Sequence, residues 1–297
     1  MTRNHTVLEA SLAALLSLAP SWCTAQQTTP PTPTPTPTPT PVQAATQLAE
    51  WPKVGDGERK KIVGAIGQFT KSEKSLHGPA HKRLVELGDL AAPLVMLAVN
   101  DRTPEANPPL FAVLDELLQP RHAALLARET KKPQTELRRY LTLRLIRFHD
   151  PAQVPTLQEL AKDQDEQTAF YASLGLLAAK QKDGLPATMA YARTHWADVT
   201  KLVAEVLPAA RSTEAADWVL AAIGKASAVE QMTGLRLLRH LLPKERAAEL
   251  KAFLKASDHT VLREAINAAR VVHGEEPIEN LPVFQAVKHQ QEWLKKL

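Results

Sequence analysis

The chain has 297 residues, of which 44% are hydrophobic, 5% aromatic and 23% charged, and its formal net charge is +4 at pH 7. This balance is typical of a soluble globular or repeat protein, and the positive charge is too small to make nucleic acid an expected partner. The single cysteine, Cys23, lies in a segment that we expect to be removed. Disulfides and cysteine-ligated metals are therefore excluded from the mature chain.

Residues 1–25 have the pattern of a secretory signal peptide. Arg3 supplies a positive charge, an apolar stretch covers residues 7–18, and Cys23 and Ala25 are small residues at the positions that a signal peptidase reads. We therefore expect cleavage before Gln26 and a periplasmic or secreted protein. The apolar stretch is too short to span a bilayer, so no transmembrane segment is expected in the mature chain.

Residues 26–50 are predicted to form a disordered linker. Thr and Pro alternate almost without interruption over residues 29–41. Proline fixes φ and lacks an amide hydrogen, so this composition favours an extended polyproline-II chain over helix or sheet. The linker could hold the folded domain away from a surface or be a passive tail, and the sequence does not decide between them.

Residues 51–297 contain an apolar pattern that repeats every 31 residues. In each unit, apolar residues lie at positions i, i+4 and i+7, which predicts an amphipathic first helix. The i+4 positions form the central set of this helix. A second set, represented by Leu126, Leu157, Val219, Leu250 and Leu281, predicts a second helix. The central set of the first helix consists of Leu114, Leu145, Leu176, Leu207, Leu238 and Ala269.

This repetition predicts an all-α fold, a right-handed α-solenoid of about seven helical-hairpin repeats of ~31 residues, because stacked hairpins bury a shared apolar core. Six copies are in register from about residue 104, and a slipped copy covers residues 77–101. A capping helix with Ile62 and Phe69 is expected before them. A compact helical bundle is the alternative. The closing helix is expected to bury Leu281, Phe284, Trp293 and Leu297 and to expose Lys288, Gln290, Gln291 and Lys295.

Two segments resemble the family of HEAT-like repeats of the PBS-lyase type. Residues 84–94, LVELGDLAAPL, are similar to the turn between the helices of such a repeat, and residues 258–265, DHTVLREA, are similar to the Asp and Val-x-Arg that open its first helix. The resemblance implies a scaffold or protein-binding surface, with a ladder of Asp–Arg pairs between repeats. Other copies depart from it, since Gln134, Trp196 and Ser227 replace the Asp and Phe170 and Met232 replace the Arg.

The motifs of common enzymes do not occur. We find no glycine-rich phosphate loop, no H-E-x-x-H and no G-x-S-x-G, and accordingly expect no catalytic residues, no cofactor and no metal. His77 and His81 have the spacing of two metal ligands on one helix face, but no suitable third ligand lies near them in the sequence.

The densest run of positive charge lies between residues 121 and 147. It contains eight basic residues and only two acidic residues, Glu129 and Glu136, which gives a local charge of +6. Such a run could bind an acidic partner or be an ordinary solvated face. These candidate partner-binding residues are Arg121, Arg128, Lys131, Lys132, Arg138, Arg139, Arg144 and Arg147.

Trp196 and Trp218 are candidate aromatic anchors, because tryptophan is common at the centre of binding surfaces. Packing in the core is the other interpretation of both. Together, these features favour an exported, non-catalytic helical-repeat scaffold or adaptor that binds another protein or an envelope component. The alternatives are an enzyme that uses the solenoid groove, as HEAT-like glycosylases and lyases do, and a structural spacer.

Overall fold

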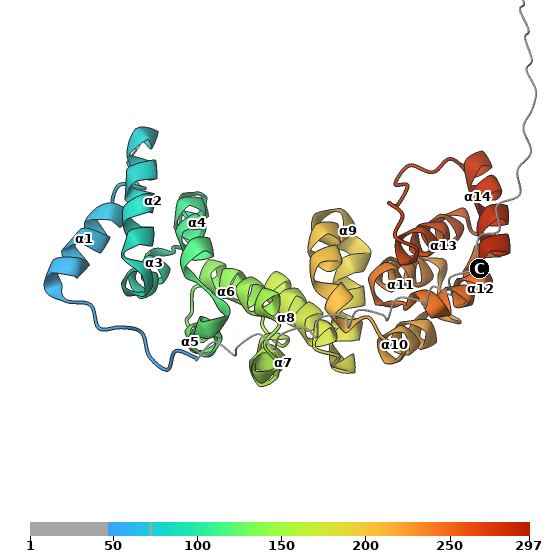
Figure 1. Cartoon of the computed structure of the whole chain (residues 1–297), viewed down its shortest axis with the longest axis horizontal. Helices are drawn as coiled ribbons and strands as arrows, with labels where there is room; N and C mark the ends of the chain where they lie inside the picture. Colours follow the sequence, from blue (N-terminus) through green and yellow to red (C-terminus); the bar gives the residue numbers. More distant parts are fainter. Residues whose placement is uncertain (1–46, 72) are drawn as a thin grey trace, which may run out of the picture. The chain divides into compact units, whose positions relative to one another are not determined.

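The computed structural model describes residues 47–71 and 73–297, and it is all-α over these residues, as predicted (Figure 1). The predicted signal peptide and most of the predicted linker lie outside the described residues. Short 3-10 turns join the helices, and none of the described residues forms a strand. The helices are α1 (Asp56–Ile66), α2 (His77–Glu86), α3 (Ala92–Ala98), α4 (Pro108–Leu117), α5 (Ala123–Glu129), α6 (Thr135–Phe148), α7 (Val154–Leu160), α8 (Glu166–Ala178), α9 (Leu185–Val206), α10 (Thr213–Ile223), α11 (Ala228–Leu241), α12 (Lys251–Leu254), α13 (His259–Val272) and α14 (Val283–Lys296).

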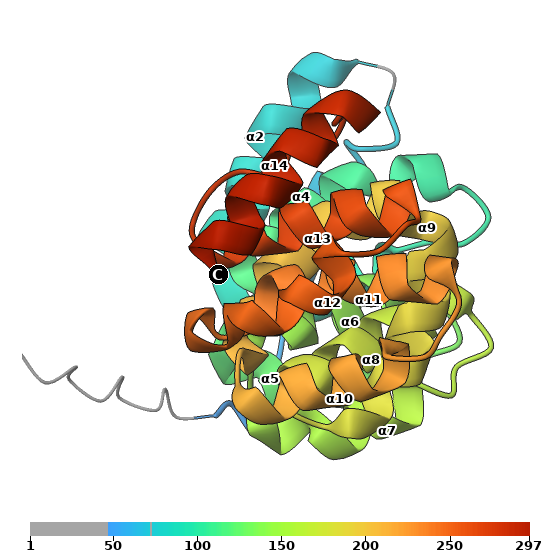
Figure 2. The same ribbon diagram turned by 90° about the vertical axis from the view of Figure 1, so that its right-hand side faces the viewer.

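Each helix packs mainly against helices that are near it in the sequence. Helix α6 packs on α5 and α8, α8 packs on α7 and α9, and α11 packs on α9, α10 and α13. In both Figure 1 and Figure 2, α5, α7 and α10 lie along one edge of the folded unit. These helices are the second helices of the predicted hairpins, and α4, α6, α8, α11 and α13 are the first.

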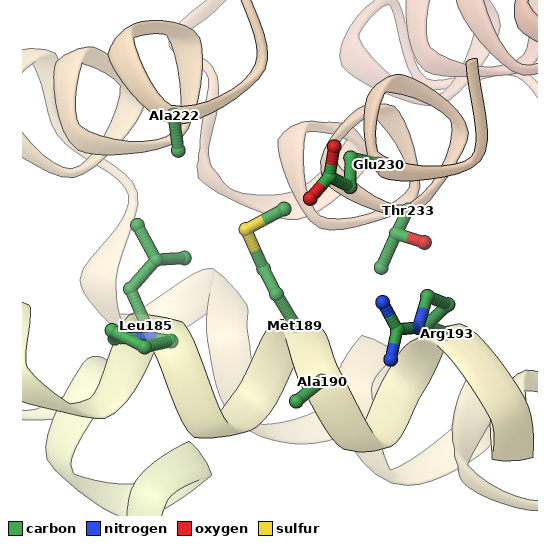
Figure 3. Close-up of a pocket in the computed structure, with 8 residues that line it drawn as sticks. Leu185, Met189, Ala190, Arg193, Ala222, Glu230 and Thr233 are labelled. Atoms are coloured by element: carbon green, nitrogen blue, oxygen red, sulfur yellow. The ribbon is translucent and has the colours of Figure 1, made fainter. Parts of the chain in front are cut away.

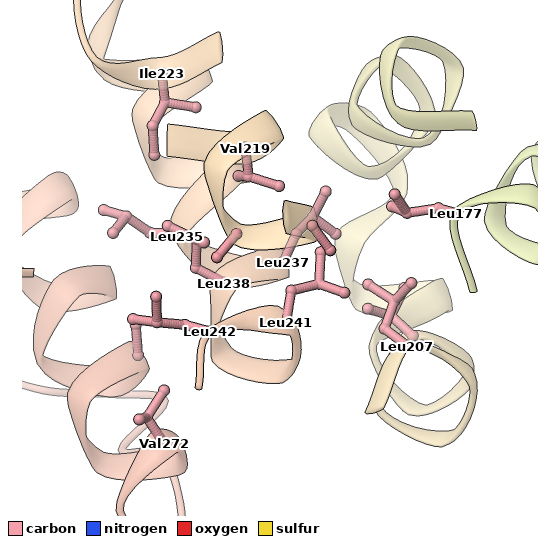
Figure 4. Packing of buried hydrophobic residues seen from close by; sticks show 14 of the residues in the cluster. Leu177, Leu207, Val219, Ile223, Leu235, Leu237, Leu238, Leu241, Leu242 and Val272 are labelled. Atoms are coloured by element: carbon pink, nitrogen blue, oxygen red, sulfur yellow. The ribbon is translucent and has the colours of Figure 1, made fainter. Parts of the chain in front are cut away.

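The apolar positions with 31-residue spacing form the centre of the core. Every member of the central set, from Leu114 to Ala269, is at most 2% exposed. Figure 4 shows Leu207, Leu238 and Leu241 among the leucines and valines that fill the space between the helices. The periodicity therefore identifies buried residues correctly, because the side chains at these positions meet the neighbouring helices rather than solvent.

Several first helices of the predicted units begin after a residue whose side chain caps the helix. The side chains of Asp165, Ser227 and Asp258 accept hydrogen bonds from the first-turn amides of α8, α11 and α13. Trp196 has the equivalent position in the fourth unit and cannot cap a helix in this way. The chain there forms the single long helix α9, with a kink at His195 where φ is −117° and ψ is 24°.

The last unit differs from its prediction. Ile278 and Leu281 lie in the coil between α13 and α14 rather than in a second helix, because Pro277 and Pro282 interrupt the segment. The expected apolar face of α14 is also wrong in part, since Phe284 is 76% exposed while Trp293 is buried. Gln290, which we expected on the exposed polar face, is half-buried and donates to the carbonyl of Leu254 at 2.5 Å.

Residues 47–51 belong to the folded unit, although the sequence places 47–50 in the linker. The Leu48 amide donates to the carbonyl of Arg121 at 2.9 Å, and the Arg128 guanidinium donates to the carbonyl of Ala49. The Trp51 ring stacks on His122, with 5.4 Å between ring centroids. Among the described helices, none combines the length and apolarity needed to cross a bilayer.

Candidate ligand-binding pocket

A pocket of about 340 Å³ lies beside α9, α11 and α13. Helix α9 contributes Trp196 just after its kink, and the loop before α14 contributes Glu279. The pocket is rich in charged side chains, in contrast to the leucine-rich core. Its lining residues are Trp196, Ala197, Thr200, Lys201, Arg236, Arg239, Arg263, Glu264, Asn267 and Glu279.

Three guanidinium groups converge on the carboxylate of Glu264, which is only 3% exposed. Arg239 Nη2 donates to Glu264 Oε2, Arg236 Nε lies 3.3 Å from Oε1, and Arg263 Nη2 lies 3.7 Å from Oε1. A buried carboxylate requires such partners, because an unpaired charge in the interior is strongly disfavoured. Three cations around one anion leave an excess of positive charge at this point.

The pocket also contains buried hydrogen-bond donors without acceptors. Among the described residues, Nε of Arg239 and Nε of Arg263 have no hydrogen-bond partner although both atoms are buried. Burial lowers the pKa of Arg239, and Glu264 opposes this by favouring the charged form. An unsatisfied buried donor is costly, so these arginines are packed around Glu264 at the expense of hydrogen bonding.

Trp196 forms an aromatic wall of the pocket and is half-buried. The guanidinium carbons of Arg236 and Arg239 lie 5.1 Å and 5.8 Å from its ring centroid. These cation–π contacts hold the two arginines beside Glu264. The structure thus brings one of the two predicted aromatic anchors into the pocket, whereas Trp218 lies on α10, half-buried against the core.

The far side of the pocket is fixed by Asn267, which is buried in α13. Its side chain donates to the carbonyl of Ile278 at 3.1 Å and accepts from the Ile278 amide at 2.7 Å. This pair of bonds holds the coil that carries Glu279 at the pocket. Counting the lining residues, four cations (Lys201, Arg236, Arg239 and Arg263) against two acids (Glu264 and Glu279) give a net charge of +2.

The predicted basic patch is arranged differently from the pocket, because its cations have partners within the fold. Arg138 Nε donates to Asp163 at 2.9 Å, and Arg139 Nε donates to Asp165 at 2.8 Å. The Asp165 partnership raises the pKa of Arg139 above its ordinary value. The remaining pairs are Arg121–Asp89, Lys131–Glu159, Lys132–Glu129, Arg144–Asp115 and Arg147–Glu205, and Arg128 is bonded to the carbonyl of Ala49.

Most of these acidic partners lie outside the basic run in the sequence. Asp163 and Asp165 precede α8, and Glu205 lies in α9. The local charge of +6 is therefore largely balanced in three dimensions. As a partner-binding surface, the patch remains a prediction.

The two histidines with metal-ligand spacing face different neighbours. His77 Nε2 lies 3.1 Å from the carbonyl of Lys71, and His81 Nε2 lies 3.4 Å from Glu116. Within residues 47–71 and 73–297, no three His, Cys, Asp or Glu side chains gather as a metal site would require.

A second hollow, of about 290 Å³, lies beside α9, α10 and α11 and is mainly apolar. Figure 3 shows Met189 pointing between Leu185 and Arg193 toward α11, with Glu230 opposite. The Glu230 carboxylate already accepts from the Ser227 amide and hydroxyl, at 3.0 Å and 2.8 Å. Arg193 is the only basic residue among the lining residues of this hollow, whereas the Trp196 pocket has four. The charged pocket is therefore the stronger candidate site.

Sequence reasoning missed Glu264 and its arginines, although one signal was present. At 31-residue spacing, Glu264 follows Tyr140, Tyr171, Leu202 and Thr233, so it is a charged residue in a largely apolar column. A buried carboxylate implies a cationic partner. Which cation pairs with it depends on how α11 packs against α13, and the sequence column gives no information on that packing.

Neither a family model nor a curated protein sequence matches the chain. Among solved structures, the chain aligns with human deoxyhypusine hydroxylase in complex with glycerol. It is 14% identical, the alignment covers 81% of this chain and 99% of that chain, and the TM-score is 0.30.

Proposed function

We propose that this protein is an exported, non-catalytic HEAT-like α-solenoid that binds an acidic segment of another protein or envelope component in the Trp196 pocket. The observation that carries the proposal is the group around Glu264, where three guanidiniums surround one buried carboxylate. Two of them keep a buried Nε without an acceptor. A carboxylate from a partner offsets the excess positive charge of this group.

The residue types in the pocket favour binding over chemistry. Arginine stays protonated in proteins and cannot exchange protons at neutral pH, so it serves to recognise anions rather than as a general base. Tryptophan and arginine are also the residues that most often dominate the energy of protein interfaces. Trp196 with Arg236 and Arg239 is such a combination, and its cation–π contacts pre-arrange the guanidiniums for a planar carboxylate.

The repeat architecture is supported by the buried 31-residue columns and by helices that pack on their sequence neighbours. The Arg139–Asp165 pair joins two successive units, as the Asp–Arg ladder of HEAT-like repeats does. About seven right-handed repeats account for these features. Export rests on the signal-peptide pattern of residues 1–25, and it makes an extracytoplasmic protein the natural class of partner.

Peptide display on the full-length chain tests the pocket. We expect the selection to enrich peptides with Asp or Glu beside an apolar residue, because the pocket combines guanidiniums with an indole. The affinity of an enriched peptide, measured by calorimetry, is expected to fall about 10- to 100-fold in Arg236→Gln, as charged hydrogen bonds contribute ~1.5–3 kcal/mol. Crosslinking in intact cells from a photoreactive residue at Ala197 then identifies the natural partner.

Arg246→Gln is the matched control. Arg246 pairs with Asp217 and Glu249 on another surface of the folded unit, so its loss removes the same charge without touching the pocket. Equal losses of affinity in Arg236→Gln and Arg246→Gln, or enrichment of peptides without acidic residues, would contradict the proposal.

A further inference from the structure

A second cationic site lies at the other end of the chain, in a groove between α1 and α2. The groove has a volume of about 370 Å³. Its walls contain three basic side chains, and none of its lining residues is acidic. The lining residues are Lys60, Lys61, Gly64, Ala65, Gln68, Leu76, Pro79, Ala80 and Arg83.

The three cations of the groove differ from those of the basic run in having no counter-charge. Among the described residues, Lys60, Lys61 and Arg83 take part in no ion pair within 4.0 Å, whereas seven of the eight basic residues of the run do. Asp56 lies on the outer side of α1 beside Lys60, and it also forms no ion pair with it. The groove is therefore a local concentration of unbalanced positive charge.

The floor of the groove is apolar and closely packed, since Ala65 is 6% exposed and Ala80 is 4% exposed. The ligand must therefore bring most of its charge to the rim, where the lysines and the arginine are exposed. A single carboxylate carries one negative charge, which is less than these cations can balance. A phosphate monoester carries about −1.5 to −2 and has three acceptor oxygens, so it matches two lysines and one forked guanidinium better.

We propose that the α1–α2 groove binds a phosphate group, either from an anionic lipid headgroup or from a free phosphorylated compound. Val63, on α1 next to Lys60, is 53% exposed and would face the same ligand or the surface that carries it. This site is separate from the Trp196 pocket and is selective for a different anion. Loss of one is expected to leave the other intact.

The test measures binding of full-length chain to three probes at physiological salt. The probes are phosphatidylcholine vesicles with and without phosphatidic acid, whose headgroup is a phosphate monoester, inorganic pyrophosphate, and a glutamate oligopeptide. The variant Lys60→Gln/Lys61→Gln/Arg83→Gln removes the groove cations. If each basic residue contributes about fivefold at an anionic surface, this variant loses about a hundredfold in affinity for the phosphate probe that binds.

The control variant Lys71→Gln/Lys74→Gln/Lys82→Gln removes the same charge from the same end of the folded unit. These lysines are exposed and do not line the groove. We expect the control to keep its affinity within about twofold, because its lysines do not line the groove and salt weakens charges that do not touch the ligand. Circular dichroism melts establish that both variants are folded.

Binding to phosphatidic acid vesicles alone assigns the site to a lipid headgroup, and binding to pyrophosphate assigns it to a free phosphate compound. The proposal is overturned if neither phosphate probe binds, or if the control loses as much affinity as the groove variant. Tighter binding of the glutamate oligopeptide than of either phosphate probe also overturns it, and indicates an acidic protein instead.

Discussion

Arg139 in α6 and Asp165 at the start of α8 join two helices that pack against each other in the core. Arg139 Nε donates to Asp165 Oδ2 at 2.8 Å, and the same carboxylate oxygen accepts from the Thr168 amide at 2.9 Å. One carboxylate thus caps α8 and ties it to the preceding unit. Both roles depend on its negative charge.

Replacing Asp165 with Asn is expected to lower the free energy of unfolding at pH 7 and to make this free energy less dependent on pH in the acid range. The hydrogen bond from Arg139 holds the pKa of Asp165 at about 2, below its ordinary value of 3.8. A depressed folded-state pKa means that this stabilisation is complete above about pH 4 and disappears as the pH falls toward 2. We expect it to amount to about 1–2 kcal/mol. Urea denaturation across this pH range measures it.

Asp198→Asn is the control for this prediction. Asp198 lies exposed on α9 and forms no hydrogen bond or ion pair among the described residues. Its replacement is expected to change stability by less than about 0.5 kcal/mol at any pH. A wild-type acid dependence in Asp165→Asn would show that the Arg139–Asp165 pair does not contribute.

His240 in α11 is expected to make the protein less stable in mild acid. Burial lowers the pKa of His240 to about 4, and Arg239 and Arg211 act in the same direction. Because the unfolded chain takes up a proton near pH 6.5 and the folded chain does so only near pH 4, stability declines as the pH falls between these values. The expected loss is about 2–3 kcal/mol. Thermal melts from pH 7 to pH 4 follow it.

His240→Gln is neutral throughout this range, so its stability is expected to decline less between pH 7 and pH 4. His289→Gln serves as the comparison, because His289 is on the outer helix α14 and pairs with Glu292. If His240→Gln loses stability in acid as steeply as the unchanged protein and His289→Gln do, proton uptake by His240 is not the cause.

Glu264→Gln is expected to destabilise the protein by about 3 kcal/mol, since it leaves three guanidiniums around a neutral amide. Glu249→Gln is the surface counterpart. Glu249 is 39% exposed and also pairs with an arginine, Arg246, and its loss is expected to cost at most about 1 kcal/mol. Guanidinium chloride denaturation of both variants gives the comparison. Equal effects would mean that Glu264 is as well solvated as a surface carboxylate.

The sequence predicts the all-α class and the buried columns because both follow from local spacing. A leucine every 31 residues meets the same kind of neighbour in each unit, so Leu145 and Leu238 are buried for the same reason. Long-range pairing does not follow from spacing. The acids that balance Arg138, Arg139 and Arg147 lie just before α8 or in α9, and counting charges within a run cannot find them.

The departures from the pattern occur where one residue changes the local chemistry. Trp196 removes a helix cap, so α9 continues through a kink and its indole enters the pocket. Pro277 and Pro282 interrupt the predicted second helix of the last repeat, and Phe284 becomes exposed as α14 packs through Trp293 instead. Comparison of the repeats identifies Trp196 as a departure from the capping Asp, but it predicts a buried Phe284, because the neighbours of a side chain depend on packing between helices.

Gly234→Ala is expected to destabilise the protein because Gly234 allows α11 to approach α10 closely. A Cβ atom at residue 234 would lie 2.3 Å from Ile223 Cγ2 and 3.2 Å from Val219 Cγ1. Overpacking of this kind costs about 1–3 kcal/mol. Gly64 in α1 has no atom within 4 Å of such a Cβ, and Gly64→Ala is expected to stabilise by about 0.5–1 kcal/mol through helix propensity. Shifts of the urea midpoint in opposite directions would confirm both expectations. Adding Ile223→Ala to Gly234→Ala is expected to relieve the clash. The two substitutions together should then destabilise the protein by less than the sum of their separate effects.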